Sequence, residues 1–398
     1  MTDDTTGGLD ATKNIQPVRF LATDDPHAQP IPGTGLCLSG GGYRAMLFHL
    51  GAVWRLNELG LLRKLVRISS VSGGSITAGM LGLRWKSLAF DAADVAINLE
   101  PLVVQPIRNL ADTTIDQGSI IKGILLPRKS IADEIAGEYR KYLFGNATLQ
   151  DLPSDTEGPR FVINATNVQT GALFRFSRPY LADYRVGQVL NPKVEIAVAV
   201  AASSAFPPVL SPLKLELDAS AWAPPSGQKS EDLHREPYLT DVVLSDGGVY
   251  DNLGLETAWK KYQTILVSNG GGKMQPEPDP KGDWARHALR INEVIDNQVR
   301  SLRVRQVIAA FEAKQRTGTY WSVRMDIADY GLPDALPCPI EKTTLLAGVK
   351  TRLKRLDASI QEQLINWGYA SCDAAMRKWV DSTLPKPDGF PYKDNGIG

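Results

Sequence analysis

The stretch Gly35–Gly51, GLCLSGGGYRAMLFHLG, joins a short apolar run, three consecutive glycines and an amphipathic run. Apolar residues then recur at the three- to four-residue spacing of a helix, at Leu47, Leu50, Val53 and Leu56. A strand that turns directly into a helix over glycines exposes backbone N–H groups at the turn. Such groups bind either a phosphate or the oxyanion of an ester under attack.

A phosphate-binding interpretation of the three glycines lacks its expected partners. A Walker loop continues into Lys-Ser/Thr, which hold phosphate and magnesium, whereas Gly42 is followed by Tyr43 and Arg44. A dinucleotide-binding turn needs G-x-G-x-x-G and a carboxylate at the end of the next strand, but that strand runs into Ser-Ser-Val-Ser at 69–72. A nucleotide-sensing module that uses this loop is therefore the weaker alternative.

Short β runs and helical runs alternate beyond this stretch. LVRISSV and GSITAGMLGLRW repeat the strand and the helix, which predicts an α/β fold with a mainly parallel sheet and helices on its faces. RFVINATN and ALFRFSR flank a turn and predict a hairpin, and YQTILVSN predicts a further strand. A long helix is predicted over INEVIDNQVRSLRVRQVIAAFEAK. Beyond Pro333 the spacing of apolar residues predicts one amphipathic helix, through Leu346, Val349, Leu353, Leu356, Ile360 and Leu364.

We expect three parts in the chain. Residues 1–33 are rich in Asp, Thr, Pro and Gly without periodicity, which predicts an extension that is partly disordered or lies on the surface. Residues 34–330 form the predicted α/β domain, and residues 331–398 a C-terminal helical extension packed on it. Within the domain, residues 217–237 form a polar insertion. We interpret it as a loop, with a lid over the site as the alternative because it contains Trp222.

The composition is that of a soluble globular protein. Of 398 residues, 43% are hydrophobic and 22% charged, and the formal net charge is zero, which gives no indication of nucleic-acid binding. One local run is basic, with Lys350, Arg352, Lys354 and Arg355. We interpret it as the solvated face of a helix, with lipid-headgroup binding as the alternative.

Cysteine usage and the N-terminus indicate a cytoplasmic protein. Cys37, Cys338 and Cys372 have no paired spacing, so we expect neither disulfides nor a zinc site, and no cofactor. The N-terminus has polar and acidic residues where a signal peptide would be basic and then apolar. No apolar run approaches the length of a membrane span, so any membrane contact is expected to be peripheral.

Ser72 lies where the second predicted strand meets its helix, in ISSVSGGSITAG. A serine between a strand and glycines that open a helix is the arrangement of a nucleophile elbow, usually G-x-S-x-G. The backbone folds closely there, so the residues two before and two after must be small. Here they are Ser70, which departs from the pattern, and Gly74. From this motif alone, a plain helix cap explains Ser72 equally well.

Asp246 follows an apolar strand in TDVVLSDGG, so we expect its carboxylate to emerge at a strand end that faces the site. A simple turn aspartate is the alternative, and Asp251 is interpreted as a helix cap. The histidines have weaker contexts: His27 in the extension, His49 within a helix, His234 in the insertion and His287 at the start of a charged helix. A histidine that meets Ser72 in space stays open, because catalytic partners need not be adjacent in sequence.

The segments SGGGYR, SVSGGS and SDGG, in this order, resemble the bacterial branch of the patatin-like phospholipases. The similarity extends to NATNVQTGALFRFS, AVAASSAFPP and WGYASCDAAMRKW, and so covers most of the chain from Gly35. The glycine loop is similar in form to that of the cytosolic phospholipase and phospholipase B relatives. The resemblance implies a three-layer α/β/α patatin-like fold and a catalytic dyad of Ser72 and Asp246 without histidine.

The resemblance also implies how these residues act. Ser72 would attack an ester carbonyl while Asp246 takes its proton, and water would then hydrolyse the acyl-enzyme. Arg44 would bind a lipid phosphate or stabilise the loop from behind. Backbone N–H groups would bind the oxyanion, those of Gly40, Gly41, Gly42 and Gly73.

The expected function is hydrolysis of acyl esters in phospholipids or related lipids, of phospholipase A or lysophospholipase type, at a membrane surface. An acyltransferase or thioesterase on the same fold is the alternative within this chemistry. Some relatives require a host protein or a cyclic nucleotide as activator, so a protein or nucleotide activator stays open here.

Overall fold

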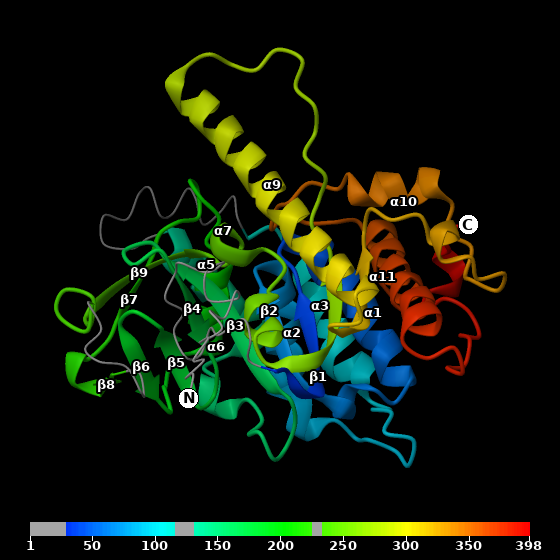
Figure 1. The fold of residues 1–398 in the computed structure, drawn as a ribbon, viewed down its shortest axis with the longest axis horizontal. Helices are drawn as coiled ribbons and strands as arrows, with labels where there is room; N and C mark the ends of the chain where they lie inside the picture. The colour runs from blue at the N-terminus through cyan, green and yellow to red at the C-terminus, as the bar shows by residue number, and fades with distance from the viewer. Residues whose placement is uncertain (1–28, 116–130, 225–232) are drawn as a thin grey trace, which may run out of the picture.

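The computed structural model describes residues 29–115, 131–224 and 233–398 (Figure 1). Its strands are β1 Ile31–Leu38, β2 Leu65–Val71, β3 Arg160–Asn167, β4 Ala172–Phe176, β5 Tyr180–Asp183, β6 Gly187–Leu190, β7 Leu213–Glu216, β8 Trp222–Ala223, β9 Asp241–Asp246, β10 Tyr262–Asn269 and β11 Thr317–Ser322. Its α-helices are α1 Gly42–Glu58, α2 Gly73–Arg84, α3 Gln105–Ala111, α5 Ile131–Tyr139, α6 Ile196–Ser203, α7 Gly248–Asp251, α8 Glu256–Trp259, α9 Trp284–Glu312, α10 Ile340–Ala347 and α11 Ala358–Trp379.

A mixed sheet runs through the described part of the chain, in the order β11-β10-β1-β2-β3-β4-β5-β6-β8. The strands from β11 to β3 pair in parallel. Beyond β3 the described pairings are antiparallel, including those of β9 with β3 and with β7. The predicted α/β class with helices on both faces of the sheet is confirmed, with the parallel strands grouped at one side of β3.

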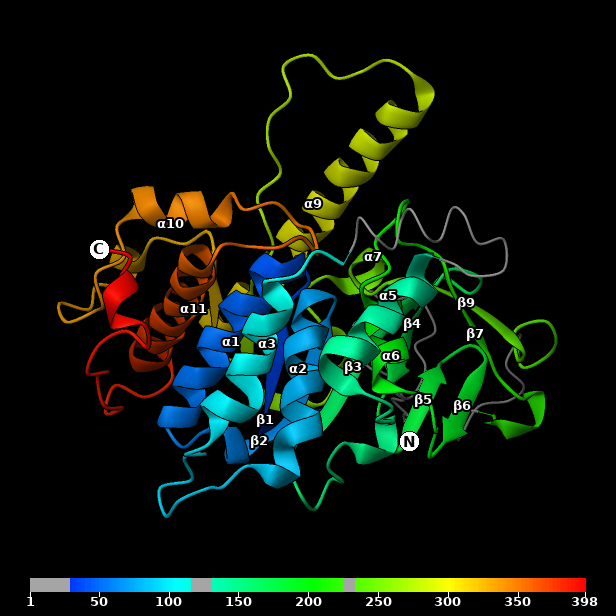
Figure 2. The ribbon, with the colours of Figure 1, turned by 180° about the vertical axis from the view of Figure 1, so that it is seen from behind.

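Alternation along β1 shows how the two faces of the sheet are covered. Leu36 and Leu38 point into the larger apolar core, whereas Cys37 between them points into a smaller one on the opposite face. Helices α1, α2 and α11 lie over the larger core (Figure 2). The smaller core is closed by α8 and by Val307 near the C-terminal end of α9.

α11 packs along α1, and two glycines permit this close approach. A Cβ atom on Gly51 would lie 1.9 Å from the Ile365 carbonyl oxygen, and one on Gly368 would lie 1.8 Å from the Phe48 carbonyl oxygen. Neither position accepts a side chain without separating the helices. Since α1 begins at Gly42, this contact also supports the end of the glycine loop.

Most of the predicted elements occur where the sequence placed them. The predicted hairpin is formed by β3 and β4, and LVRISSV coincides with β2. β1 begins earlier than predicted, at Ile31, so it includes the last residues of the expected extension, of which residues 1–28 lie outside the described ranges. α9 also begins earlier, at Trp284 rather than Ile291.

The single amphipathic helix predicted beyond Pro333 is wrong. α10 ends at Ala347 and α11 begins at Ala358, and the segment between them is not helical. Its backbone bonds to distant residues instead: the Arg352 carbonyl accepts from Tyr43 N–H at 3.1 Å, and the Leu353 carbonyl from Ile115 N–H at 3.0 Å. The basic run 350–355 is therefore not a helix face but a connection that runs past the start of α1.

Two further features bear on membrane contact and on a lid. The indole of Trp222 is buried and donates to the Leu239 carbonyl at 2.8 Å, so this side chain packs into the fold; residues 225–232 of the insertion lie outside the described ranges. Among the helices of the described ranges, none has both the length and the apolar character needed to cross a bilayer.

Candidate active site

Ser72 occupies a sharp turn between β2 and α2. Its φ of 51° and ψ of −119° are a conformation that residues other than glycine rarely adopt. Its side chain makes no capping hydrogen bond to α2, which argues against the simple helix-cap interpretation. The turn has the strained backbone of a nucleophile elbow and presents a hydroxyl that no capping bond engages.

A hydrogen-bond chain from two other elements holds this backbone. The Ser72 N–H donates to Ser203 Oγ at 2.9 Å, and the Ser203 hydroxyl donates to the Asn164 carbonyl at 2.6 Å. Ser203 is the last residue of α6 and Asn164 lies in β3, so three separate elements meet at the turn. These hydrogen bonds offset the energetic cost of the strained backbone at Ser72.

Close packing explains the small residues around Ser72. A Cβ atom on Gly74 would lie 2.5 Å from the Leu38 carbonyl oxygen, and one on Gly73 would lie 2.2 Å from the Gly42 carbonyl oxygen. Ser70, the departure from the usual motif, is fully buried and donates to the Val162 carbonyl at 3.3 Å. The elbow therefore lies directly against the glycine loop.

Asp246 reaches Ser72 on an antiparallel strand. β9 pairs with β3 so that Asp246 is opposite Ala165, while Val71 of β2 is opposite the neighbouring Asn164. β4 occupies the other edge of β3, so β9 follows the end of β2 along the same edge and the register places Asp246 beside Ser72. As expected, Asp246 lies at the end of a strand, and that strand runs antiparallel to β3.

The Asp246 carboxylate is buried and hydrogen-bonded. Gly248 N–H donates to its Oδ1 at 2.7 Å, and the Ser72 side chain lies near enough to lower the pKa of this carboxyl. Burial raises the pKa of Asp246 to about 7, against the opposing effects of Gly248 N–H and the Ser72 side chain, and the negative charge of Asp296 on α9 raises it further. A carboxylate with a pKa near neutrality, next to a hydroxyl, is suited to accept a proton from it.

The glycine loop offers N–H groups next to the elbow. Gly41 and Gly42 have φ of 144° and 60°, which side-chain-bearing residues rarely adopt. In the part of the chain that the structure describes, no acceptor bonds the N–H groups of Gly41, Gly42 or Gly73. Gly40 differs from the expectation, because its N–H already donates to the Asn252 carbonyl at 3.0 Å.

Arg44 lies behind the loop rather than in front of it. It is 2% exposed; its Nε donates to the Gly270 carbonyl at 2.9 Å and its Nη2 to Thr351 Oγ1 at 3.0 Å. Its Nη1 donates to the Val349 carbonyl. The guanidinium thus joins α1 to the segments after β10 and α10, the geometry of the stabilising role rather than of phosphate binding.

His49 supports the loop without touching the dyad. It is fully buried, with Nε2 2.9 Å from the Ser39 carbonyl oxygen and Nδ1 2.8 Å from Ser268 Oγ. Because a carbonyl only accepts, Nε2 carries the proton, and burial lowers the pKa of His49 to about 4. The ring is therefore neutral and holds the residue that precedes Gly40.

The structure also places the other candidate residues, the remaining histidines and Asp251. Among the described histidines, none bonds to Ser72 or Asp246: His234 contacts the Val186 carbonyl at 2.7 Å, and His287 is exposed on α9. His27 lies outside the described residues. Asp251 accepts from Glu256 N–H at 2.7 Å at the start of α8, so its prediction as a helix cap is confirmed.

Sequence reasoning missed the residues that position this site. Ser203 lies in AVAASSAFPP, which indicated only a helix of small residues, and Asn252 follows the cap Asp251. Asn252 lies between the two loops: Cβ atoms on Gly40 and Gly248 would be 2.4 Å and 2.7 Å from its Oδ1. No local pattern identifies such residues, because their partners are distant in sequence.

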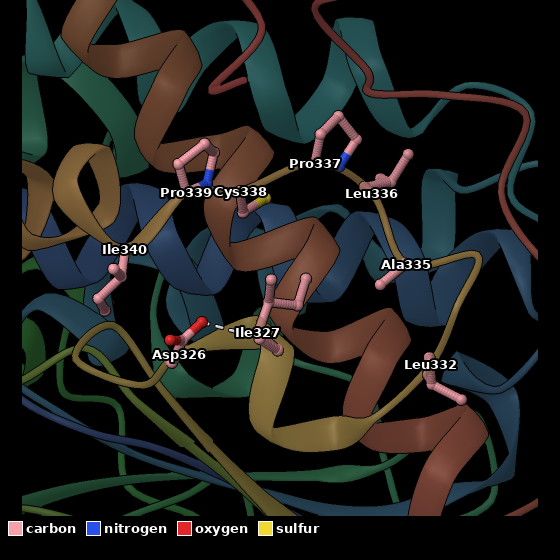
Figure 3. Close-up of a pocket in the computed structure, with 10 residues that line it drawn as sticks. Asp326, Ile327, Leu332, Ala335, Leu336, Pro337, Cys338, Pro339 and Ile340 are labelled. Atoms are coloured by element: carbon pink, nitrogen blue, oxygen red, sulfur yellow. Dashed lines mark hydrogen bonds between the residues drawn. The ribbon is translucent and has the colours of Figure 1, made fainter.

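A shallow pocket of about 390 Å³ lies elsewhere, between the 3-10 helix η8 Ile327–Tyr330 and the start of α10 (Figure 3). It is lined mainly by apolar residues between Asp326 and Ile340. The Asp326 carboxylate accepts from Ala328 N–H at 3.0 Å and so caps η8. Its lining includes Cys338 and Asp326, but the thiol is buried with a raised pKa and the carboxylate caps η8, so we do not assign the catalytic centre to this pocket.

Comparison with protein families identifies the domain. The model of the patatin-like phospholipase family matches residues 36–259, more than half of the chain and the part that contains Ser72 and Asp246. The chain belongs to the patatin-like phospholipase family. Comparison with curated protein sequences gives no significant match.

Three solved structures illustrate what this patatin-like chain is similar to. Human GIVD cytosolic phospholipase A2, in complex with methyl gamma-linolenyl fluorophosphonate, has a TM-score of 0.49 and 14% identity, over 86% of this chain and 58% of that chain. VipD from Legionella pneumophila has a TM-score of 0.34 and 14% identity, over 86% and 66%. ExoU of Pseudomonas aeruginosa, in complex with SpcU, has a TM-score of 0.24 and 19% identity, over 45% and 39%. The chain therefore spans less than two thirds of the length of each of these proteins.

Proposed function

We propose that this chain is a serine-dependent lipid acyl hydrolase of phospholipase A or lysophospholipase type, which acts at a membrane surface without a cofactor. The observation that carries the proposal is Ser72 at a strained elbow, with its side chain beside the buried Asp246 carboxylate and influencing its pKa, in a chain of the patatin-like phospholipase family. We further propose residues 34–330 as the catalytic domain and 331–398 as its helical extension.

In the first half-reaction Ser72 Oγ attacks the carbonyl carbon of an acyl ester and its proton passes to Asp246. A pKa of about 7 leaves a large fraction of Asp246 ionised at neutral pH, so the base is present without activation by a histidine. The tetrahedral oxyanion binds to the N–H groups of Gly41, Gly42 and Gly73. When it collapses, Asp246 returns the proton to the departing alcohol and the acyl group stays on Ser72.

In the second half-reaction water attacks the acyl-enzyme. Asp246 takes one proton from the water, the oxyanion forms again at the same N–H groups, and the proton then returns to Ser72 Oγ as the fatty acid leaves. Arg44 acts here as a positioning residue, since it fixes the start of α1 to Gly270 and Thr351.

Labelling with an alkyl fluorophosphonate tests the chemistry, and release of fatty acid from phospholipid vesicles tests the substrate. We expect labelling and fatty-acid release by the wild type and neither by Ser72→Ala. Ser204→Ala is the matched control, because the Ser204 hydroxyl is buried nearby but has no hydrogen-bond partner among the described residues. Equal labelling of Ser72→Ala and wild type would exclude Ser72 as the nucleophile.

The acyltransferase and thioesterase alternatives differ only in the group that receives or carries the acyl chain. Product analysis with competing alcohol acceptors and with acyl thioesters separates them from the hydrolase. A hydrolase releases free fatty acid from phospholipid even when an acceptor alcohol is present.

A further inference from the structure

Helix α9 is long but buries little of its surface. Of its 29 residues, only Val307 and Ala310 are buried, both near its C-terminal end. Figure 1 shows its N-terminal half projecting beyond the rest of the fold. An ion pair between Arg303 and Glu256, at 2.7 Å, helps to hold the C-terminal half on the domain.

Most of the exposed large apolar side chains of this helix follow one line along it, and Leu289, Val294 and Ile308 lie outside that line. We name the residues on the line the α9 stripe: Trp284, Ile291, Ile295, Val299 and Leu302. Their exposed fractions run from 38% for Val299 to 86% for Trp284. Spacings of seven, four, four and three residues place them within an arc of about 80° at 3.6 residues per turn. A contiguous exposed apolar face of this kind marks an interaction surface.

The opposite side of α9 borders the candidate active site. Arg300 Nη1 donates to the Gly272 carbonyl at 3.1 Å, and Arg300 Nε lies 3.0 Å from an Asp296 oxygen. The charge of Asp296 in turn raises the pKa of Asp246. The stripe is therefore carried by the helix that lies beside the dyad, on the side turned away from it.

Charges around the stripe favour a lipid surface over a second copy of the chain. Between residues 284 and 302, the acidic Glu293 and Asp296 lie away from the stripe, and the same segment contains three arginines. The positions closest to the stripe carry no carboxylate: Ala285, His287, Asn292 and Gln298. Asp296 lies further out, about 60° from Val299. Paired helices select each other through opposite charges at such positions, so this face lacks what a self-pairing helix needs. The three arginines lie on the charged face opposite the stripe, and each pairs with a carboxylate. An apolar face with a terminal tryptophan, opposite a charged face, suits the interface of a bilayer.

We propose that the α9 stripe docks the protein on a lipid surface. The stripe enters the headgroup region, and the dyad beside α9 is thereby held next to the bilayer. Docking itself depends only on the stripe, whereas its consequence for catalysis rests on the proposed acyl hydrolase function.

Sedimentation of the full chain with vesicles of phosphatidylcholine and phosphatidylglycerol tests the docking. The variant Ile291→Ser/Ile295→Ser/Leu302→Ser removes the centre of the stripe. The matched control is Ile97→Ser/Leu190→Ser/Leu345→Ser, which removes three aliphatic side chains that are 73%, 56% and 72% exposed elsewhere on the surface. We expect vesicle binding to weaken at least tenfold in the stripe variant and less than twofold in the control.

Activity on two substrates separates docking from chemistry. In the stripe variant, hydrolysis of vesicle phospholipid falls at least tenfold, whereas hydrolysis of a water-soluble short-chain nitrophenyl ester changes less than twofold. Absence of wild-type binding to the vesicles, or equal binding by the stripe variant, overturns the proposal. So does a wild-type oligomer whose mass in solution falls to that of one chain in the stripe variant, since the stripe then pairs with a second copy. If the wild type hydrolyses neither ester but only the stripe variant loses vesicle binding, the acyl hydrolase fails and the docking surface stands.

Discussion

α9 and α11 both carry apolar residues at helical spacing, but they differ in how much of their surface the rest of the fold covers. α11 is buried almost continuously from Leu364 to Arg377, whereas α9 buries only two residues. Even the charges of α11 are enclosed: Asp373 pairs with Arg55 at 2.8 Å and with Arg377 at 2.9 Å. The same periodicity thus produces a core helix in one place and an exposed one in the other.

This difference suggests that α11 serves mainly the stability of the fold and α9 mainly its function. α11 holds α1, and α1 begins at the glycine loop, so α11 supports the site through the core. α9 contributes little burial and instead borders the dyad through Asp296 and Arg300. We therefore expect changes near α11 to unfold the protein and changes on the α9 stripe to leave the fold intact.

The largest effect is expected at the dyad that lies beside α9. Asp246→Asn removes the base, so hydrolysis of a short-chain ester should fall by about 10³-fold. In the wild type the ionised form is the active one, so the rate should fall tenfold per pH unit below about 7 and level off above it. Steady-state kinetics from pH 5 to 9 measure both effects. Asp241→Asn, at the exposed start of the same strand, is the control and should retain the wild-type profile.

The same substitution should stabilise the fold at neutral and alkaline pH. The folded-state pKa of Asp246 is raised from 3.8 to about 7, so the folded state binds the proton more tightly and loses stability as pH rises through this window. Above pH 7 the lost stability is on the order of 4 kcal/mol, which Asp246→Asn recovers. Urea unfolding of the variant and the wild type at pH 5 and pH 8 measures this difference in the free energy of unfolding. An equal stability difference between variant and wild type at the two pH values would contradict the raised pKa.

Substitution at the crossing of α1 and α11 tests the stabilising region. Gly368→Ala places a Cβ atom 1.8 Å from the Phe48 carbonyl oxygen, so the helices must separate. We expect a loss of about 3 kcal/mol in the free energy of unfolding. Gly282→Ala, just before α9, meets no atom within 4 Å and should change stability by less than about 0.5 kcal/mol. If the two variants lose similar amounts of unfolding free energy, the crossing of α1 and α11 is no more important for stability than the segment before α9.

A smaller effect is expected from the hydrogen bond that holds the elbow. Ser203→Ala leaves the Ser72 N–H without its acceptor, so Ser72 becomes less well positioned and kcat should fall about tenfold, with KM for a short ester nearly unchanged. Ser203→Thr keeps the hydroxyl and should restore part of the rate. If the two variants have equal kcat, the hydroxyl does not position Ser72.

The smallest effect on stability is expected on the α9 stripe. Ile291→Ser/Ile295→Ser/Leu302→Ser alters side chains that are 44%, 51% and 52% exposed, so the free energy of unfolding should change by less than about 0.5 kcal/mol for each position. Thermal unfolding measures it. A loss of several kcal/mol would show that this face packs within the fold.

The elements around Ser72 followed from the sequence because their causes are local. The alternation of strand and helix, the small residues beside Ser72 and the glycines before α1 act over a few residues, and β2, α1 and α2 occur as predicted. Local backbone geometry and periodicity suffice for such elements. The same holds for Asp251, whose capping partners lie within five residues.

Long-range contacts decided what the sequence left open or indicated wrongly. The antiparallel register of β9 brings Asp246 beside Ser72. The Asn252 carbonyl accepts a hydrogen bond from Gly40 N–H, and Arg44 bonds to residues more than 200 positions away. The apolar spacing through 348–357 predicted a helix. The backbone of that segment instead forms hydrogen bonds with α1 and with the end of α3, so it is not helical. The sequence predicted a long helix at α9 and a tail helix that coincides with α11 only in its first residues, Ala358 to Leu364. Only the tertiary structure decided that α11 is enclosed and α9 exposed, because burial depends on which surfaces the rest of the chain brings into contact.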